Sequence, residues 1–239
     1  GKAFFRPGDE VIGIRTTFSV YRATALLYGA KFVSVSESEE SVPLESYLQA
    51  LTPKTRAIFL CNPTNPTGAY YAEREVLGFL EKVPSDVLVF IDEAYSEFAT
   101  AADYPQLVPL LSKFQNLMLN RTFSKVYGLA GLRIGYAFSS EEVTRAMWKV
   151  KPPFDVNLAA QAAAVAALSD DEHLRRTLEM NARGIRELSE AFGALGFRVL
   201  PTQANFLCIR IGEKCAELVK FLERNGMIVR YLKSFGLPE

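Results

Sequence analysis

Short apolar runs alternate with amphipathic stretches from the start of the chain to Pro152-Pro153. The apolar runs predict strands at 10–14, 31–35, 56–61, 87–91, 116–120 and 132–137. The stretches between them predict helices at 18–29, 44–51 and 72–82. Strands that alternate with helices favour an α/β fold with a mostly parallel sheet, in which reactive groups gather at the carboxyl ends of the strands.

The pattern changes after Pro153. An Ala-rich stretch with almost no charge predicts a buried or domain-bridging helix at 157–168, and a long charged helix follows at 171–195. The remaining elements are predicted to be strands at 197–200, 204–210 and 227–230 and a helix at 214–225. We therefore expect a large domain at 1–153 and a smaller α+β domain at 154–239.

Composition excludes several classes of function. Lys plus Arg and Asp plus Glu both number 27 among 239 residues, and this zero net charge argues against nucleic acid or a membrane surface as the main partner. No apolar run approaches the roughly 20 residues that a transmembrane helix needs. The three cysteines and one histidine do not have the number or spacing of a zinc site, so we expect no metal. Unpaired cysteines in apolar stretches favour a reducing, cytoplasmic location.

Three segments carry polar groups directly after predicted strands. Asn65-Pro-Thr-Gly68 forms a rigid turn, and Asp92 ends an apolar run at a place where it could hold a cation. Ser124-Lys125, followed by Arg133, suits an imine-forming amine beside a phosphate, because hydroxyls and a guanidinium bind phosphate oxygens. Taken singly, each segment has an ordinary structural explanation, as a tight loop, a helix cap or a packed turn.

In their order and spacing these segments resemble the fold-type I pyridoxal-phosphate-dependent aminotransferases of class I/II, most closely the histidinol-phosphate aminotransferase branch. The matching stretches are Pro7–Val11, Asn65–Gly68, Asp92–Tyr95, Ser124-Lys125, Gly131–Gly135, Ala204–Leu207 and Val229-Arg230. The resemblance implies a three-layer sandwich for the large domain and an incomplete small domain.

The resemblance also implies a cofactor, pyridoxal 5'-phosphate, and a role for each matching residue. Lys125 would form a Schiff base with it and move the substrate proton, and Asp92 would pair with the ring nitrogen. Asn65 and Tyr95 would donate hydrogen bonds to the phenolic oxygen. The remaining cofactor contacts would come from Phe18, stacked on the ring, and from Thr122, Ser124 and Arg133 at the phosphate.

For the substrate, the resemblance implies that Arg230 binds the phosphate of histidinol phosphate and that Asn205 belongs to the same site. We therefore expect a transaminase of histidine biosynthesis that moves an amino group from histidinol phosphate to 2-oxoglutarate. Aminotransferases of aromatic or other amino acids, threonine-phosphate decarboxylases and a non-catalytic module with this fold remain alternatives.

The family carries further stretches before Pro7 and after Glu239, so both ends of this chain are short by comparison. Two explanations are open: a fragment of a full enzyme, or a short protein that has lost part of its cofactor site. Members of the family build their sites across a two-fold dimer, so the resemblance also implies a homodimer.

Overall fold

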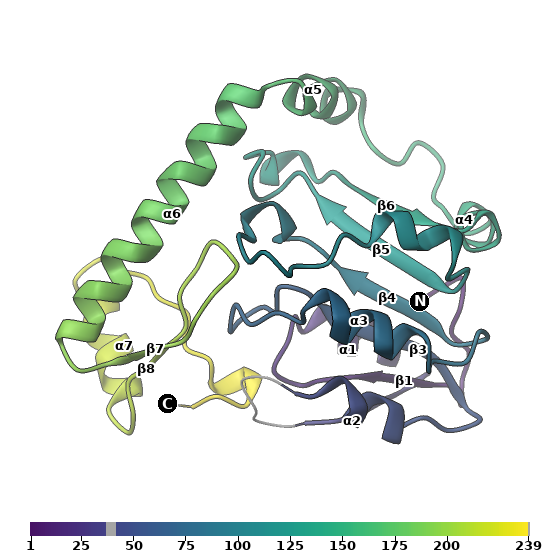
Figure 1. Cartoon of the computed structure of the whole chain (residues 1–239), viewed down its shortest axis with the longest axis horizontal. Coiled ribbons are helices and arrows are strands. Elements are labelled where there is room, and N and C mark those ends of the chain that lie inside the picture. The colour runs from purple at the N-terminus through teal and green to yellow at the C-terminus, as the bar shows by residue number, and fades with distance from the viewer. Residues whose placement is uncertain (37–41, 239) are drawn as a thin grey trace.

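The computed structural model of the chain describes residues 1–36 and 42–238. At its centre lies a six-stranded sheet with the order β2-β1-β3-β4-β5-β6 (Figure 1). Neighbouring strands from β2 to β5 run parallel, and β6 pairs antiparallel with β5. The strands are β1 Glu10–Gly13, β2 Lys31–Ser34, β3 Thr55–Cys61, β4 Leu88–Asp92, β5 Leu117–Thr122 and β6 Gly135–Ser139.

Both faces of this sheet are packed, because alternate residues of each strand point to opposite sides. In β3, Ile58 and Leu60 join the cluster on the face covered by α2 (Leu44–Gln49) and α3 (Glu73–Leu80). Ala57 and Phe59 join the cluster on the other face, which α1 (Val20–Leu27) covers. The predicted three-layer α/β arrangement with a mostly parallel sheet is therefore confirmed.

The C-terminal part of the chain extends away from the sheet. Figure 1 shows the long helix α6 leading from α5 to a small unit in which β7 and β8 pair antiparallel beside α7. The elements of this part are α4 Glu141–Trp148, α5 Leu158–Leu168, α6 Asp171–Ala194, β7 Arg198–Val199, β8 Ile209–Arg210 and α7 Cys215–Arg224.

Three expectations about this part were wrong or incomplete. Residues 227–230 form no strand, and Ile228 is 91% exposed, because no neighbouring strand pairs with this segment among the described residues. The helix α4 was not predicted, although Ser140 caps its start by accepting a hydrogen bond from the Val143 amide. The helix at 157–168 is present and bridges toward α6, but it is not buried: Ala160 and Ala164 alone are buried along it.

The architecture places the carboxyl ends of β3, β4 and β5 side by side. The register pairs Cys61 with Asp92 and Asp92 with Asn120, so the loops that follow these three strands emerge at one edge of the sheet. In a parallel α/β sheet this edge is where ligands bind. Within the described residues, no helix has the length and apolar character required to span a bilayer.

Candidate functional site

Asp92 is the buried centre of the site. Its Oδ2 accepts a hydrogen bond of 2.6 Å from the Tyr21 hydroxyl, and its Oδ1 accepts bonds from the Ala94 amide at 3.0 Å and from Asn120 Nδ2 at 3.2 Å. Burial raises the pKa of this carboxyl, whereas these three donors and the charge of Lys125 act to lower it. The carboxylate is thus surrounded by donors that favour its ionised form.

Asn65 and Tyr95 meet beside it. The Asn65 amide donates to the Tyr95 hydroxyl at 2.9 Å, although the two residues come from different loops. The Lys125 Nζ lies 5.1 Å from the centre of the Tyr95 ring, and the Phe206 ring meets the same tyrosine edge-on with centroids 5.1 Å apart. Four of the predicted residues, with Asp92, therefore come together at the carboxyl edge of the sheet.

The lysine is exposed on a loop that is itself well anchored. Its neighbours Phe123 and Val126 are buried, which leaves Lys125 directed outward between two fixed points. The Ser124 amide donates to Thr122 Oγ1 at 3.1 Å, so the two predicted phosphate ligands are adjacent. The ring Nε2 of His173, in the first turn of α6, lies 3.1 Å from the Val126 carbonyl oxygen and ties that helix to the lysine loop.

Two predicted cofactor ligands lie at the margin of this group. Arg133 has a left-handed backbone (φ 56°), is exposed, and donates to the Ala130 carbonyl at 2.6 Å, so its guanidinium stays on its own turn. Phe18 is 43% exposed and packs edge-on against Tyr21 with ring centroids 5.8 Å apart. Through Tyr21, Phe18 is next to Asp92 and keeps one face of its ring accessible.

A segment near the C-terminus docks on the loop that carries Asn65. The Gln203 amide donates to the Gly68 carbonyl at 2.9 Å, and its side-chain oxygen accepts bonds from the amides of Thr100 at 2.6 Å and Ala101 at 3.0 Å. Gly68 has a φ of +80°, and a Cβ there would lie 2.0 Å from Thr202 Oγ1. Glycine at position 68 is therefore what allows the two segments to approach.

We expect Gly68→Ala to lower the free energy of unfolding by at least ~2 kcal/mol, because alanine is strained at positive φ and overlaps Thr202. Gly78→Ala is the matched control: Gly78 lies inside α3, a Cβ there meets nothing within 4 Å, and the change should stabilise the helix by up to about 1 kcal/mol. Urea denaturation of both variants measures the difference. Equal stability of the two variants would contradict this account of Gly68.

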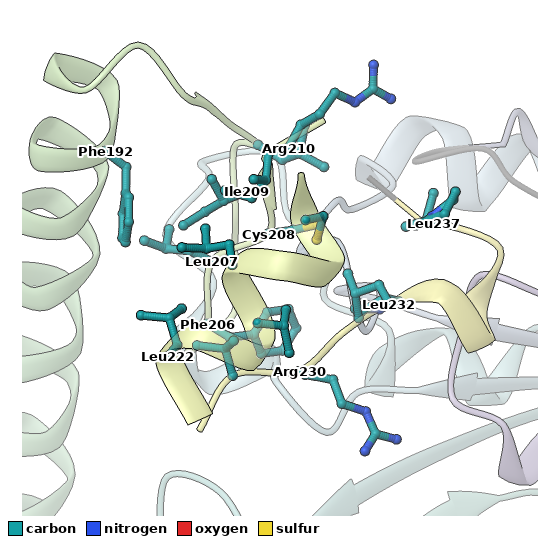
Figure 2. Close-up of a pocket in the computed structure, with 18 of the residues that line it drawn as sticks. Phe192, Phe206, Leu207, Cys208, Ile209, Arg210, Leu222, Arg230, Leu232 and Leu237 are labelled. Carbon is teal, nitrogen blue, oxygen red and sulfur yellow. The ribbon is translucent and has the colours of Figure 1, made fainter. Parts of the chain in front are cut away.

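The two predicted substrate residues lie on the C-terminal side. A cavity of about 660 Å³ is lined mainly by apolar side chains of β8, α7 and the following segment, and its wall includes Asn65 and Arg230. Figure 2 shows the Arg230 side chain pointing away from the apolar residues, and its guanidinium lies 5.8 Å from the centre of the Phe235 ring. Asn205 is exposed and does not contribute to that wall. The structure thus brings Arg230, but not Asn205, to the cavity that Asn65 lines.

Sequence reasoning missed Tyr21 and Asn120, which both bind the Asp92 carboxylate. Asn120 had the signal that identified Asp92, a polar residue after an apolar strand. Tyr21 belonged to a group of aromatics that core packing explains equally well, and it does stack on Phe59 with centroids 5.1 Å apart.

The sheet, the buried carboxylate and the lysine loop define a class of α/β protein that comparison identifies. The family described as "Aminotransferase class I and II" matches residues 2–239, and the chain belongs to this family. It is 43% identical to a histidinol-phosphate aminotransferase of a Geobacillus species over 99% of this chain and 65% of that protein.

Solved structures agree with this family. A histidinol-phosphate aminotransferase of Sinorhizobium meliloti, crystallised with pyridoxal-5'-phosphate, superposes with a TM-score of 0.90 at 28% identity, over 96% of this chain and 64% of that one. An L-threonine-O-3-phosphate decarboxylase of Porphyromonas gingivalis gives a TM-score of 0.82 at 26% identity, over 98% of this chain and 70% of that one. The chain spans 65% of the Geobacillus relative and 64% of the Sinorhizobium one, less than two thirds of each.

Proposed function

We propose that the chain carries the cofactor machinery of a pyridoxal-phosphate-dependent aminotransferase, with histidinol phosphate as the favoured amino donor and 2-oxoglutarate as the acceptor. The observation that carries this proposal is the convergence of Asn65, Asp92, Tyr95 and Lys125 from separate loops at one edge of the sheet. The family and the relatives described above support the same chemistry.

The donor set fits this cofactor. A buried carboxylate that accepts three hydrogen bonds is suited to a cationic ring nitrogen, since an uncharged nitrogen would leave the buried charge without compensation. The Asn65–Tyr95 pair offers donors for a phenolic oxygen, and Thr122 and Ser124 offer hydroxyls for a phosphate. When bound, pyridoxal phosphate supplies a ring that withdraws electrons from the substrate's α-carbon.

Each residue then has a task that its position supports. Lys125 supplies the amine that links covalently to the cofactor and, once released, carries a proton to and from the substrate carbon. Asp92 keeps the ring nitrogen protonated, because its ionised carboxyl stabilises a positive charge beside it. Tyr95, held by Asn65, directs its hydroxyl at a developing oxyanion, and Phe18 presents an aromatic face for stacking.

Absorbance spectroscopy of the purified chain with pyridoxal phosphate tests the proposal. An imine band that borohydride fixes onto Lys125, located by peptide mapping, would support it. Transfer of the amino group of histidinol phosphate to the bound cofactor, followed by recovery with 2-oxoglutarate, tests the reaction. Carbon dioxide release without an oxo acid would favour a decarboxylase instead. A folded chain that binds no cofactor would overturn the proposal.

For the substrate, we expect Arg230→Ala to reduce kcat/KM for a phosphorylated amine about 10- to 100-fold, the usual effect of losing a charge-assisted bond to phosphate. Unphosphorylated aromatic amines should change by only a few-fold. Arg224→Ala, which removes an exposed arginine at the end of α7, is the control. An equal loss for both kinds of amine would contradict phosphate binding by Arg230.

We also propose a cytoplasmic homodimer. The apolar helix α5 exposes Leu158 at 80% and Val165 at 69%, a surface that a second copy could cover. Sedimentation equilibrium at several protein concentrations tests this, and a monomer at all of them would contradict it.

A further inference from the structure

The ends of β4 and β5 are joined by paired side chains on both faces of the sheet. The register sets Asp92 opposite Asn120, and side chains at paired positions of neighbouring strands point to the same face. One position further on, Arg121 Nε donates to Glu93 Oε2 at 2.9 Å on the opposite face, where the Glu93 side chain is fully buried. The two strand ends are thus fixed to each other at the position of Asp92.

Asn120 contributes a donor that the local backbone cannot supply. The Ala94 amide, two residues from Asp92, is the other donor to Oδ1, and Tyr21 binds the second oxygen from α1. Because an amide does not titrate, its hydrogen bond holds the carboxylate at every pH at which the protein is folded. The bond crosses from one strand to the next, so it also fixes the carboxylate plane relative to the strand that leads to Lys125.

Several titratable groups surround this carboxylate. From the elements packed against Asp92 they are the hydroxyl of Tyr21, the thiol of Cys61, the carboxyl of Glu93 and the amine of Lys125. Burial keeps the first two neutral: it raises the pKa of the Cys61 thiol to about 12 and that of Tyr21 well above its ordinary value. Glu93 is held by Arg121 on the other face.

The geometry points to Asn120 as a positioning residue, whose amide orients the Asp92 carboxylate and keeps it ionised for a cationic ring nitrogen. This inference rests on the proposed function for the identity of the cation. The position of Asn120 and its contact with Asp92 hold without it.

Two variants of the full chain test the inference. Asn120→Leu removes the donor with little change in size, and the isosteric Asn120→Asp replaces it with a second carboxyl. We expect the pKa of Asp92, followed by ¹³C NMR of labelled aspartate in the protein without cofactor, to rise in both variants, because each loses a bond to the ionised form. With pyridoxal phosphate added, we expect about tenfold weaker binding and an altered pH dependence of the imine absorbance.

Asn116→Leu is the matched control. Asn116 lies just before β5 at the other end of the strand, where its amide donates to the carbonyls of Pro84 and Val87. Its loss should lower stability without moving the Asp92 titration or the imine absorbance. If Asn120→Leu fails to fold, Asn120→Asp decides.

The outcomes separate the two proposals. An unchanged Asp92 titration in a folded Asn120 variant would overturn the role of Asn120, whatever the chain binds. A raised Asp92 pKa in a chain that does not bind pyridoxal phosphate would retain Asn120 as the residue that orients Asp92 and reject the proposed function.

Discussion

Replacement of Lys125 by alanine should reduce amino transfer roughly 10⁴-fold, the upper range for loss of a positioned acid–base group. The same change should abolish attachment of the cofactor by borohydride, because no amine remains to form the link. The fold should be unaffected, since Lys125 is exposed on a loop held by the buried residues Phe123 and Val126. Stopped-flow absorbance and peptide mapping measure the two effects.

Lys113→Ala is the control for this substitution. Lys113 pairs with Glu81 at 2.7 Å on the surface, and both side chains are more than half exposed, so its loss should cost less than about 1 kcal/mol and leave catalysis unchanged. Turnover of Lys125→Ala within tenfold of the parent chain would contradict the proposed role of the lysine.

Replacement of Asp92 by asparagine should lower kcat/KM roughly 10³-fold, because a neutral amide cannot compensate a cationic ring nitrogen. The hydrogen bonds at this site can persist, since the asparagine oxygen accepts from Ala94 and Asn120 and its amide can donate to the Tyr21 hydroxyl. A loss of activity with an intact fold would therefore be electrostatic in origin.

The same variant should be more stable than the parent chain at neutral pH. Burial raises the pKa of Asp92 in the folded protein above its ordinary value of 3.8, so the folded state binds this proton more tightly than the unfolded state. The ionised carboxylate then costs stability above the folded pKa, and the cost disappears as the pH falls through that value to below 3.8. Thermal melts of both proteins across this range should converge in acid, and a constant difference would contradict the prediction.

Much of the large sheet could be predicted because its strands are buried on both faces. Runs such as 56–61 and 87–91 are apolar without interruption, which is typical of parallel strands packed between helix layers. The amphipathic stretches that became α2 and α3 carry the complementary apolar stripe.

The C-terminal part was less predictable because its apolar residues depend on partners that lie elsewhere. Met227, Ile228 and Val229 have the composition of a strand, but a strand forms only against a neighbour, and these side chains are all about half exposed or more. The helix α5 has apolar residues on every side, which predicted burial, yet within the described residues only two alanines are covered.

The candidate site shows the same division. Asn65, Asp92 and Lys125 follow predicted strands, and the carboxyl edge of a parallel sheet brings such positions together without knowledge of the register. The bond from Asn120 to Asp92 requires the register itself, which pairs these two residues and no others along the strands. Sequence patterns do not specify that pairing between strands buried on both faces.

The helix α6 acts mechanically as a lever. Its 24 residues span about 36 Å at 1.5 Å per residue. Its first turns touch the lysine loop through His173, and Leu174 and Leu178 pack against the cluster that contains Tyr95 and Val126. A rotation of about 5° at this fulcrum moves the far end by about 3 Å, simply from that length. Adjustments of the lysine loop too small to disturb the sheet are therefore amplified into opening or closing of the unit that carries Arg230.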